Sequence, residues 1–202
     1  MKDSRRGLLL VISGPSGVGK GTVNKGLLSR NPNMKMSVSA TTRAKRPGEV
    51  EGVSYFFKTR EEFEKMIKLD AFLEYMDVFG ANYYGTPRAY VDEELASGND
   101  IILEIDVKGA MNVKRMCPEA VLIFIAPPSM SELKTRLIGR ATETPDAVER
   151  RFQTAFEEMK RIEQYDYVVV NDVLDKAITN VESIITAERL KTSRLSVDFW
   201  KE

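Results

Sequence analysis

The residues best suited to chemistry stand near the start of the chain, in the stretch SGPSGVGKGT from Ser13 to Thr22. A glycine-rich turn between a strand and a helix directs several backbone N–H groups at one point, and the helix N-terminus adds partial positive charge there. Lys20 supplies a full positive charge for the β- and γ-phosphates of a nucleotide. Because an apolar run precedes the turn and a helical pattern follows it, the stretch predicts a phosphate-binding loop. The residues expected to hold the phosphates are Gly14, Pro15, Ser16, Gly17, Val18, Gly19, Lys20, Gly21 and Thr22.

Position 21 departs from the common pattern of such loops, in which a serine or threonine follows the lysine. Gly21 has no hydroxyl, so the usual side-chain ligand for Mg²⁺ is missing. The metal would be held mainly by phosphates and water, with Thr22 as the candidate protein ligand. The order Gly-Lys-Gly-Thr looks more like nucleoside monophosphate kinases than like switch GTPases. A GTPase is also disfavoured because VVVNDV lacks the lysine of an Asn-Lys-x-Asp guanine motif.

A basic cluster follows at Arg43, Lys45 and Arg46, in a turn-rich segment that leads to Tyr55. The guanidinium fork of arginine suits phosphate, and a tyrosine hydroxyl adds a neutral donor. Alone, this pattern is also typical of a solvated basic loop or a weak RNA-binding patch. Beside a phosphate-binding loop it favours a second anion site, separate from the first.

Two carboxylates, Glu104 and Asp106, close the apolar run IILEID. Two residues apart on a strand, they would point to one face, and carboxylates at the end of a buried strand are costly unless they bind something. They could order Mg²⁺-bound water, or serve as structural partners for an arginine.

Three arginines further along could close over a nucleotide. Arg136 and Arg140 lie one helical turn apart in LKTRLIGR, and Arg151 follows the TETPD break with Arg150 as its neighbour. Scattered arginines more often mark a solvated helix face, and the residues alone leave both interpretations open.

Composition excludes several classes of protein. Thirty basic residues balance thirty acidic ones, which argues against a general nucleic-acid or membrane-surface protein. The chain has no histidine and a single cysteine, Cys117, so a Cys/His dyad, a Ser-His-Asp triad and histidine-bound zinc are all ruled out. Any metal must then be held by oxygen, which favours Mg²⁺. The apolar run near the start is too short for a signal peptide, and AVLIFIA is far below the roughly 20 residues of a membrane span, so we expect a cytoplasmic protein.

The elements that must position these residues can be read from periodicity. Short apolar runs at residues 8–13, 100–106, 120–126 and 167–172 are typical of buried parallel strands. Strands that alternate with helices predict a doubly wound α/β core, whose ligands bind at the carboxyl ends of the strands. Helical patterns follow Gly19, Lys108, Ser129, Thr144 and Val173.

Residues from about 36 to 88 break this rhythm with the strand-like pieces MSVSATT, SYFF and AFLEYMDVF around one helix. Thr59 and Glu62 form a capping-box pattern at the start of that helix. A second irregular stretch, GRATETPD, is flanked by arginine-bearing helices and is expected to be a mobile lid. We expect one domain over residues 7–190, with a core of 7–35, 89–132 and 153–190, an insertion of 36–88, a lid of 133–152, and a tail of 191–202.

Six stretches occur in the order and spacing of guanylate kinase. They are GPSGVGKGT, SVSATTRAKRPGEVEGVSYFF, FLEYMDVFGANYYGTP, ILEIDVKGA, IFIAPPS and GRATET, and they run from about residue 7 to 190. The chain therefore resembles this family of P-loop nucleoside monophosphate kinases. The resemblance implies an α/β fold with a P-loop parallel sheet flanked by helices, an inserted mixed α/β subdomain that binds GMP, and a short helical lid.

The resemblance also implies the activity, which is transfer of the γ-phosphoryl group of ATP to GMP, and to dGMP, giving ADP and GDP. Mg²⁺ would accompany ATP, transfer would be direct and in line, and the role would be purine metabolism with GMP recycling. The partners would be small molecules, with no nucleic acid or membrane, and the protein a monomer or homodimer.

Residue roles follow from the same resemblance. The guanine pocket maps onto Ser39, Glu74 and Thr86, and Asp106 could help to hold the base. The chemistry agrees, because a carboxylate accepts from both the N1–H and the amine of guanine, whereas adenine has no N1–H. The GMP phosphate is expected at Arg43, Arg46, Tyr55 and Tyr84, with Tyr83 left out. Lys20, Arg136, Arg140 and Arg151 would stabilise the transferring group, and adenine would lie near Asn171 and Asp172.

Two other functions are less consistent with the sequence. A kinase that acts on another monophosphate, such as AMP, is disfavoured by Glu74 with Ser39 and Thr86. A protein-binding module that has lost catalysis is disfavoured because the loop lysine and both sets of arginines are present. The tail LSVDFWKE carries Phe199 and Trp200, whose role the sequence does not reveal.

Overall fold

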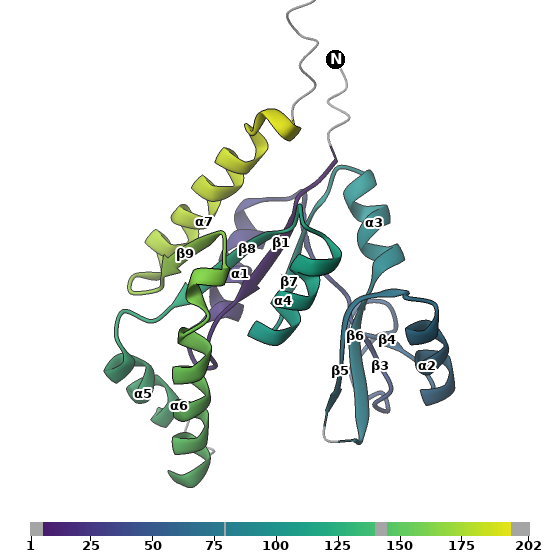
Figure 1. Ribbon diagram of the computed structural model, residues 1–202, viewed down its shortest axis with the longest axis horizontal. Helices are drawn as coiled ribbons and strands as arrows, with labels where there is room; N and C mark the ends of the chain where they lie inside the picture. The colour runs from purple at the N-terminus through teal and green to yellow at the C-terminus, as the bar shows by residue number, and fades with distance from the viewer. Residues whose placement is uncertain (1–5, 79, 140–144, 195–202) are drawn as a thin grey trace, which may run out of the picture.

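Two β-sheets organise the residues that the computed structural model describes, which are 6–78, 80–139 and 145–194 (Figure 1). The larger sheet has five parallel strands in the order β2-β7-β1-β8-β9. The four apolar runs predicted to be parallel strands are therefore confirmed. The strand bounds are Leu9–Ser13 for β1, Met34–Met36 for β2, Asp100–Glu104 for β7, Val121–Ala126 for β8 and Tyr167–Val170 for β9.

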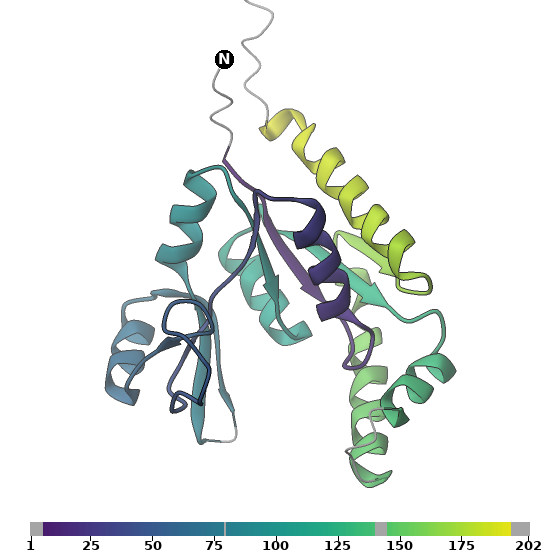
Figure 2. The same cartoon turned by 180° about the vertical axis from the view of Figure 1, so that it is seen from behind.

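Helices cover both faces of this parallel sheet, as the opposite views of Figures 1 and 2 show. Successive strand residues point to opposite faces, so Leu10 and Ile12 pack with α1 and α7, whereas Leu9 and Val11 pack with α3 and α4. Burial on both faces explains why these strands are continuous apolar runs. The helix bounds are Lys20–Arg30 for α1, Arg88–Ala96 for α3, Val107–Met116 for α4 and Leu174–Arg189 for α7. The predicted fold class, a parallel sheet flanked by helices, is confirmed.

The smaller sheet is mixed and has the order β4-β3-β6-β5. Strands β3 and β4 are parallel, and the other pairs are antiparallel. Its bounds are Ala40–Thr41 for β3, Phe56–Phe57 for β4, Phe72–Val78 for β5 and Asn82–Pro87 for β6.

Helix α2, Arg60–Lys68, covers the smaller sheet and gives it a core of its own. Thr59 accepts from the N–H of Glu62 while the Glu62 carboxylate accepts from the N–H of Thr59, so the predicted capping box is confirmed. The Phe63 ring stacks between Phe72 and Tyr83, with centroids 4.3 and 5.2 Å away.

Two strands and one α-helix were not predicted. Strand β2 has only three residues and lacks an apolar run, and its Met36, expected in the insertion, pairs with Ile102 in the parallel sheet. Strand β6 contains Gly85 and Pro87, which disfavour strands. Gly85 is required by close packing, because a Cβ there would lie 2.9 Å from Tyr75 Cβ. Helix α3 was also missing from the predicted helices.

Helices α5, Met130–Ile138, and α6, Pro145–Met159, pack on each other beyond the carboxyl ends of the parallel strands. The smaller sheet projects on the other side of the same end (Figure 1). Both predicted helix starts are confirmed, at Met130 after its Ser129 N-cap and at Pro145. In the part of the chain that the structure describes, no helix is long and apolar enough to cross a membrane.

Candidate active site

The loop between β1 and α1 has the backbone of a phosphate cradle. Gly14, Gly17 and Gly19 have φ values of 139°, 87° and 96°, which other residues rarely adopt. A Cβ at Gly14 would also lie 2.2 Å from the Ile125 carbonyl oxygen of β8. Glycine is therefore needed both for the turn and for its close approach to the neighbouring strand.

Lys20 and the start of α1 make this loop attractive to anions. The Lys20 ammonium donates to the carbonyl oxygens of Gly14 and Pro15, at 2.5 and 3.1 Å, so the side chain folds back over the loop. The Gly19 N-cap has no side chain to bond the first N–H groups of α1, and the first turn carries no acidic residue. A cavity of about 410 Å³ opens here, lined by Pro15, Ser16, Gly17, Gly19, Lys20, Gly21, Thr22, Lys25 and Glu104.

Glu104 brings a carboxylate from β7 to this cavity. Its Oε2 accepts from Asn24 Nδ2 at 2.7 Å, and Asn24 is only 2% exposed. A Cβ at Gly21 would lie 3.8 Å from Glu104 Oε2, so the carboxylate faces the place where the common hydroxyl is missing. Together with Thr22, Glu104 provides the oxygen ligands that suit Mg²⁺. Among the described residues, no three acidic or cysteine side chains gather as a metal site.

Asp106 lies elsewhere than the strand pattern predicted. Strand β7 ends at Glu104, and Asp106 is the N-cap of α4, where its Oδ1 accepts from the N–H of Gly109 at 2.7 Å. The two carboxylates therefore do not continue one strand face, because the chain turns into the helix between them. Asp106 instead borders a cavity of about 350 Å³ between β5, α4 and α6, which Met76 and Glu158 also line.

The predicted guanine residues come together on the smaller sheet. Glu74 on β5 lies opposite Thr86 on β6, whose hydroxyl donates to Glu74 Oε1 at 2.7 Å. The ladder that pairs Ala40 with Gly85 brings Ser39, the residue before β3, beside Thr86. Burial raises the pKa of Glu74, and the charge of Asp106 raises it further, against the bond from Thr86.

Three of the predicted phosphate residues form a second group beside the same sheet, namely Arg43 and Tyr55 of the loop between β3 and β4 and Tyr84 of β6. The guanidinium of Arg43 lies 5.4 Å from the centroid of the Tyr55 ring, and Tyr55 meets Tyr84 edge to face at 6.0 Å. Tyr83 points the other way, into the stack on Phe63. The structure thus separates the two adjacent tyrosines, which the sequence could not.

Of the two predicted lid arginines that the structure describes, one bonds the phosphate loop and the other bonds its neighbour Asn171. Arg151 on α6 donates to the Ser16 hydroxyl of the loop. Arg136 on α5 donates to the carbonyl of Asn171 at 3.1 Å, and the buried Asn171 amide donates to the carbonyl of Val18 at 2.8 Å. Asn171, the residue after β9, therefore connects the phosphate loop to α5. Arg140, the third predicted arginine, lies outside the described residues.

Three residues near these groups were not among the predicted site residues. They are Asn24, which bonds Glu104, Glu49, which bonds Arg43, and Glu158 of α6. Burial and the charge of Asp106 raise the pKa of Glu158, while Lys20 lowers it. Asn24 could have been noticed as a polar residue in a helix beside a buried strand. Only the fold indicates the other two.

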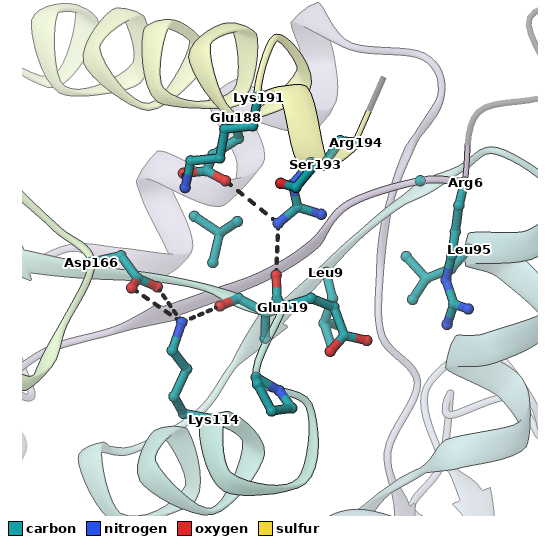
Figure 3. A pocket seen from close by; sticks show the side chains of 14 residues that line it. Arg6, Leu9, Leu95, Lys114, Glu119, Asp166, Glu188, Lys191, Ser193 and Arg194 are labelled. Carbon is teal, nitrogen blue, oxygen red and sulfur yellow. Dashed lines mark hydrogen bonds and ion pairs between the residues drawn. The ribbon is translucent and has the colours of Figure 1, made fainter. Parts of the chain in front are cut away.

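A larger cavity, of about 550 Å³, lies at the opposite end of the parallel sheet, near Leu9 at the start of β1 (Figure 3). Several of its charged side chains pair with each other, as Lys114 does with Asp166 at 2.8 Å and Arg194 with Glu188 at 3.4 Å. Ligands of parallel α/β sheets bind at the carboxyl ends of the strands. The phosphate loop and its surroundings, not this cavity, are therefore the candidate active site.

Comparisons with known proteins find relatives along nearly the whole chain. The family model described as Guanylate kinase matches residues 6–188. Guanylate kinase of Caldanaerobacter subterraneus subsp. tengcongensis is 50% identical over 194 residues, which cover 96% of this chain and 94% of that protein. Guanylate kinase of Clostridioides difficile is 51% identical over 190 residues, 94% of this chain and 92% of that protein. The crystal structure of guanylate kinase from Anaplasma phagocytophilum matches with a TM-score of 0.73 and 37% identity, covering 98% and 94% of the two chains.

Proposed function

The chain belongs to the guanylate kinase family and is an ATP:GMP phosphotransferase, and we propose that it moves the γ-phosphoryl group in one direct, in-line step. The observation that supports the proposal is that two groups of residues suited to bind anions lie at the same end of the parallel sheet. One is the phosphate loop, and the other is the Arg43 cluster of the smaller sheet. Two polyanions held in line need little covalent chemistry from the protein.

The donor side of the reaction is assigned to the phosphate loop. Lys20 and the N–H groups at the start of α1 bind the ATP phosphates, and Arg136 and Arg151 neutralise the charge that develops on the transferring group. Arg140 is proposed to join them, and Asn171 to border the adenine. Mg²⁺, bound with ATP, would neutralise phosphate charge, and Glu104 and Thr22 are the residues placed to hold its water shell.

The acceptor side is assigned to the smaller sheet. Glu74 accepts from the N1–H and the amine of guanine, with Ser39 and Thr86 beside it and Asp106 as a further candidate. Arg43, Arg46, Tyr55 and Tyr84 bind the phosphate of GMP. That phosphate is already an anionic nucleophile, so no general base is required. None of these assignments uses the 2′-hydroxyl, so dGMP should also be a substrate.

We assign one substrate to each of the two projecting parts of the molecule. The insertion of residues 36–88 carries GMP, and the lid of residues 133–152 brings its arginines over ATP and excludes water. The single domain would span residues 7–190.

A coupled assay of ADP formation with GMP, dGMP, AMP, CMP and dTMP, with and without Mg²⁺, tests the substrates and the metal. We expect turnover with GMP and dGMP only, and only when Mg²⁺ is present. The stereochemical course at a chiral γ-phosphorus tests the mechanism, and inversion is expected. Retention, or a phosphoenzyme trapped on the pathway, would overturn the in-line step.

A further inference from the structure

The loop between β3 and β4 contains two acidic residues, and one of them, Glu49, bonds two of the basic residues of the loop. The Arg43 guanidinium donates to both oxygens of the Glu49 carboxylate, from Nη2 to Oε1 at 2.6 Å and from Nη1 to Oε2 at 3.1 Å. The N–H of Arg46 donates to the same carboxylate at 2.8 Å. The side chains of Arg43 and Glu49 are only 13% and 19% exposed, so this contact is more than a surface ion pair.

We propose that Glu49 is a positioning residue for the GMP-phosphate site, which holds the Arg43 guanidinium and the Arg46 backbone in the arrangement that receives the phosphate. The inference rests on the proposed function, because it assumes that Arg43 binds that phosphate.

The contacts fix the plane of the guanidinium. A bidentate pair allows only one orientation of the fork, and the aromatic ring of Tyr55 borders the guanidinium as well. Arg43 Nη1 uses its other hydrogen on the carbonyl of Ala44, at 2.7 Å. Of the five N–H donors of arginine, these bonds leave the Nε–H and one Nη2–H for a further acceptor. A phosphate can therefore bind Arg43 without displacing Glu49.

The same carboxylate also closes the turn that carries Arg46. The N–H of Glu49 donates to the carbonyl of Arg46 at 3.1 Å, while the Glu49 side chain accepts from the N–H of Arg46. Gly48 lies between them with a φ of 85°, so the turn has the backbone that glycine favours. Because this bond to the backbone does not involve Arg43, Glu49 stays in place when Arg43 bonds a ligand.

The opposite role would be competition, in which the carboxylate occupies Arg43 until a phosphate displaces it. The two roles predict opposite changes in GMP affinity when the Glu49 carboxylate is removed. A positioning carboxylate strengthens GMP binding, so that its removal weakens it. A competing carboxylate weakens GMP binding, so that its removal strengthens it. The bonds from Arg43 and then from Arg46 lower the pKa of Glu49, so the carboxylate carries its charge at neutral pH.

The test is calorimetric binding of GMP and of guanosine to Glu49→Gln. The glutamine keeps the length of the side chain but turns one acceptor into a donor that opposes the Arg43 fork. The dissociation constant of GMP should rise by about tenfold or more, the scale of a lost charge-assisted bond. The dissociation constant of guanosine, which has no phosphate, should stay within about twofold, and so should that of ATP. The KM for GMP should rise with little change in kcat, because positioning of the bound phosphate is restored at saturation.

Glu51→Gln is the matched control. Glu51 lies in the same loop and also accepts from the backbone, from the N–H of Phe57 at 3.0 Å, but it bonds none of the arginines that the structure describes. It should leave GMP binding unchanged. Glu49→Asp keeps the negative charge on a shorter side chain that cannot reach the same position. Its GMP binding should therefore also be weakened, because positioning depends on geometry and not on charge alone.

Three outcomes overturn the inference, namely tighter GMP binding by Glu49→Gln, unchanged GMP binding, or an equal loss for guanosine. Arg43→Met separates this failure from that of the proposed function. If Arg43→Met loses GMP binding while Glu49→Gln keeps it, only the role of Glu49 is wrong. If Arg43→Met binds GMP like the unaltered protein, the proposed phosphate site is wrong.

Discussion

At the scale of single residues, Gly21 leaves the phosphate loop without the common hydroxyl, and the Glu104 carboxylate faces the vacant position. Asn24 holds that carboxylate from the next turn of α1, at 2.7 Å. The buried Asn24 keeps its Oδ1 without a partner, which is costly. A carboxylate from β7 thus stands where other loops supply a hydroxyl from the helix.

Replacing Gly21 with Ser tests this arrangement. The new Cβ would lie at ordinary contact distance, 3.8 Å, from Glu104, so the loop should keep its shape. The Mg²⁺ concentration for half-maximal rate should change by about threefold or more, while the KM for GMP changes by less than about twofold. Gly21→Ala adds the Cβ without the hydroxyl and is the control. A large loss of GMP binding with an unaltered Mg²⁺ response would contradict the prediction.

Glu74 should make recognition of guanine sensitive to acid. Burial raises its pKa, so it protonates at a higher pH than an ordinary glutamate, and the protonated acid no longer accepts from both guanine donors. Guanosine affinity should therefore fall as pH drops through this raised pKa. The pH dependence of folding stability has the opposite sign. A group whose pKa is raised in the folded state stabilises the fold at low pH, and this contribution is lost as pH rises.

The measurement is calorimetry with guanosine rather than GMP, since a phosphate itself titrates near pH 6. Glu74→Gln should bind guanosine weakly, with no fall in affinity over the same pH range. A fall with the same midpoint in Glu74→Gln would assign the titration to another group.

At the scale of elements, helix α6 presents Arg151 to the phosphate loop and its neighbour Arg150 to solvent. Adjacent helical residues differ by about 100° in direction, so only one of the pair can face the loop. Helix α5 presents Arg136 to the carbonyl that follows β9 in the same way. The two helices thus act as rigid supports that aim arginines across the strand ends.

Arg151→Met should lower kcat by about two orders of magnitude or more, because the arginine stabilises charge in the transition state. The KM for GMP should stay within about threefold, since the acceptor site is on another element. Arg150→Met removes the same charge from the exposed face of α6, and its kcat should match that of the unaltered protein. Equal losses of kcat in both variants would mean that the total positive charge of α6, and not the position of Arg151, determines the rate.

At the scale of the whole molecule, the two sheets have separate cores. The parallel sheet buries its strands between helices on both faces, whereas the core of the smaller sheet is Phe63 of α2 packed on Phe72 and Ala40. Because its core is small, we expect the smaller sheet to be the less stable of the two parts, as a part that adjusts around a substrate would be.

Phe63→Ala should lower the free energy of unfolding by about 3–5 kcal/mol, the cost of removing a buried ring. In urea below the global transition, this variant should lose GMP binding while it still binds ATP. Leu122→Ala, in the core of the parallel sheet, should lose both ligands together. Fluorescence-monitored ligand titrations across a urea series provide the comparison, and simultaneous loss in Phe63→Ala would mean that the two cores unfold as one.

Much of the fold and of the site was predictable because the signals are local. The phosphate loop lies within ten residues, the capping box within four, and each buried strand of the core within one apolar run. Such features depend on backbone geometry and on neighbours along the chain, so the sequence by itself determined the α/β class, the loop and most helix starts. Strands β2 and β6 were missed because their pairing, not their composition, stabilises them.

The tertiary structure decided which distant residues share a site. Thr86 reaches Glu74 across 12 positions, Asn24 reaches Glu104 across 80, and Arg151 reaches Ser16 across 135. It also turned Tyr84 to the site and Tyr83 to the core, and made Asp106 a helix cap rather than a strand residue. Such choices follow from the register and order of strands, which burial over the whole chain sets and no short stretch of sequence contains.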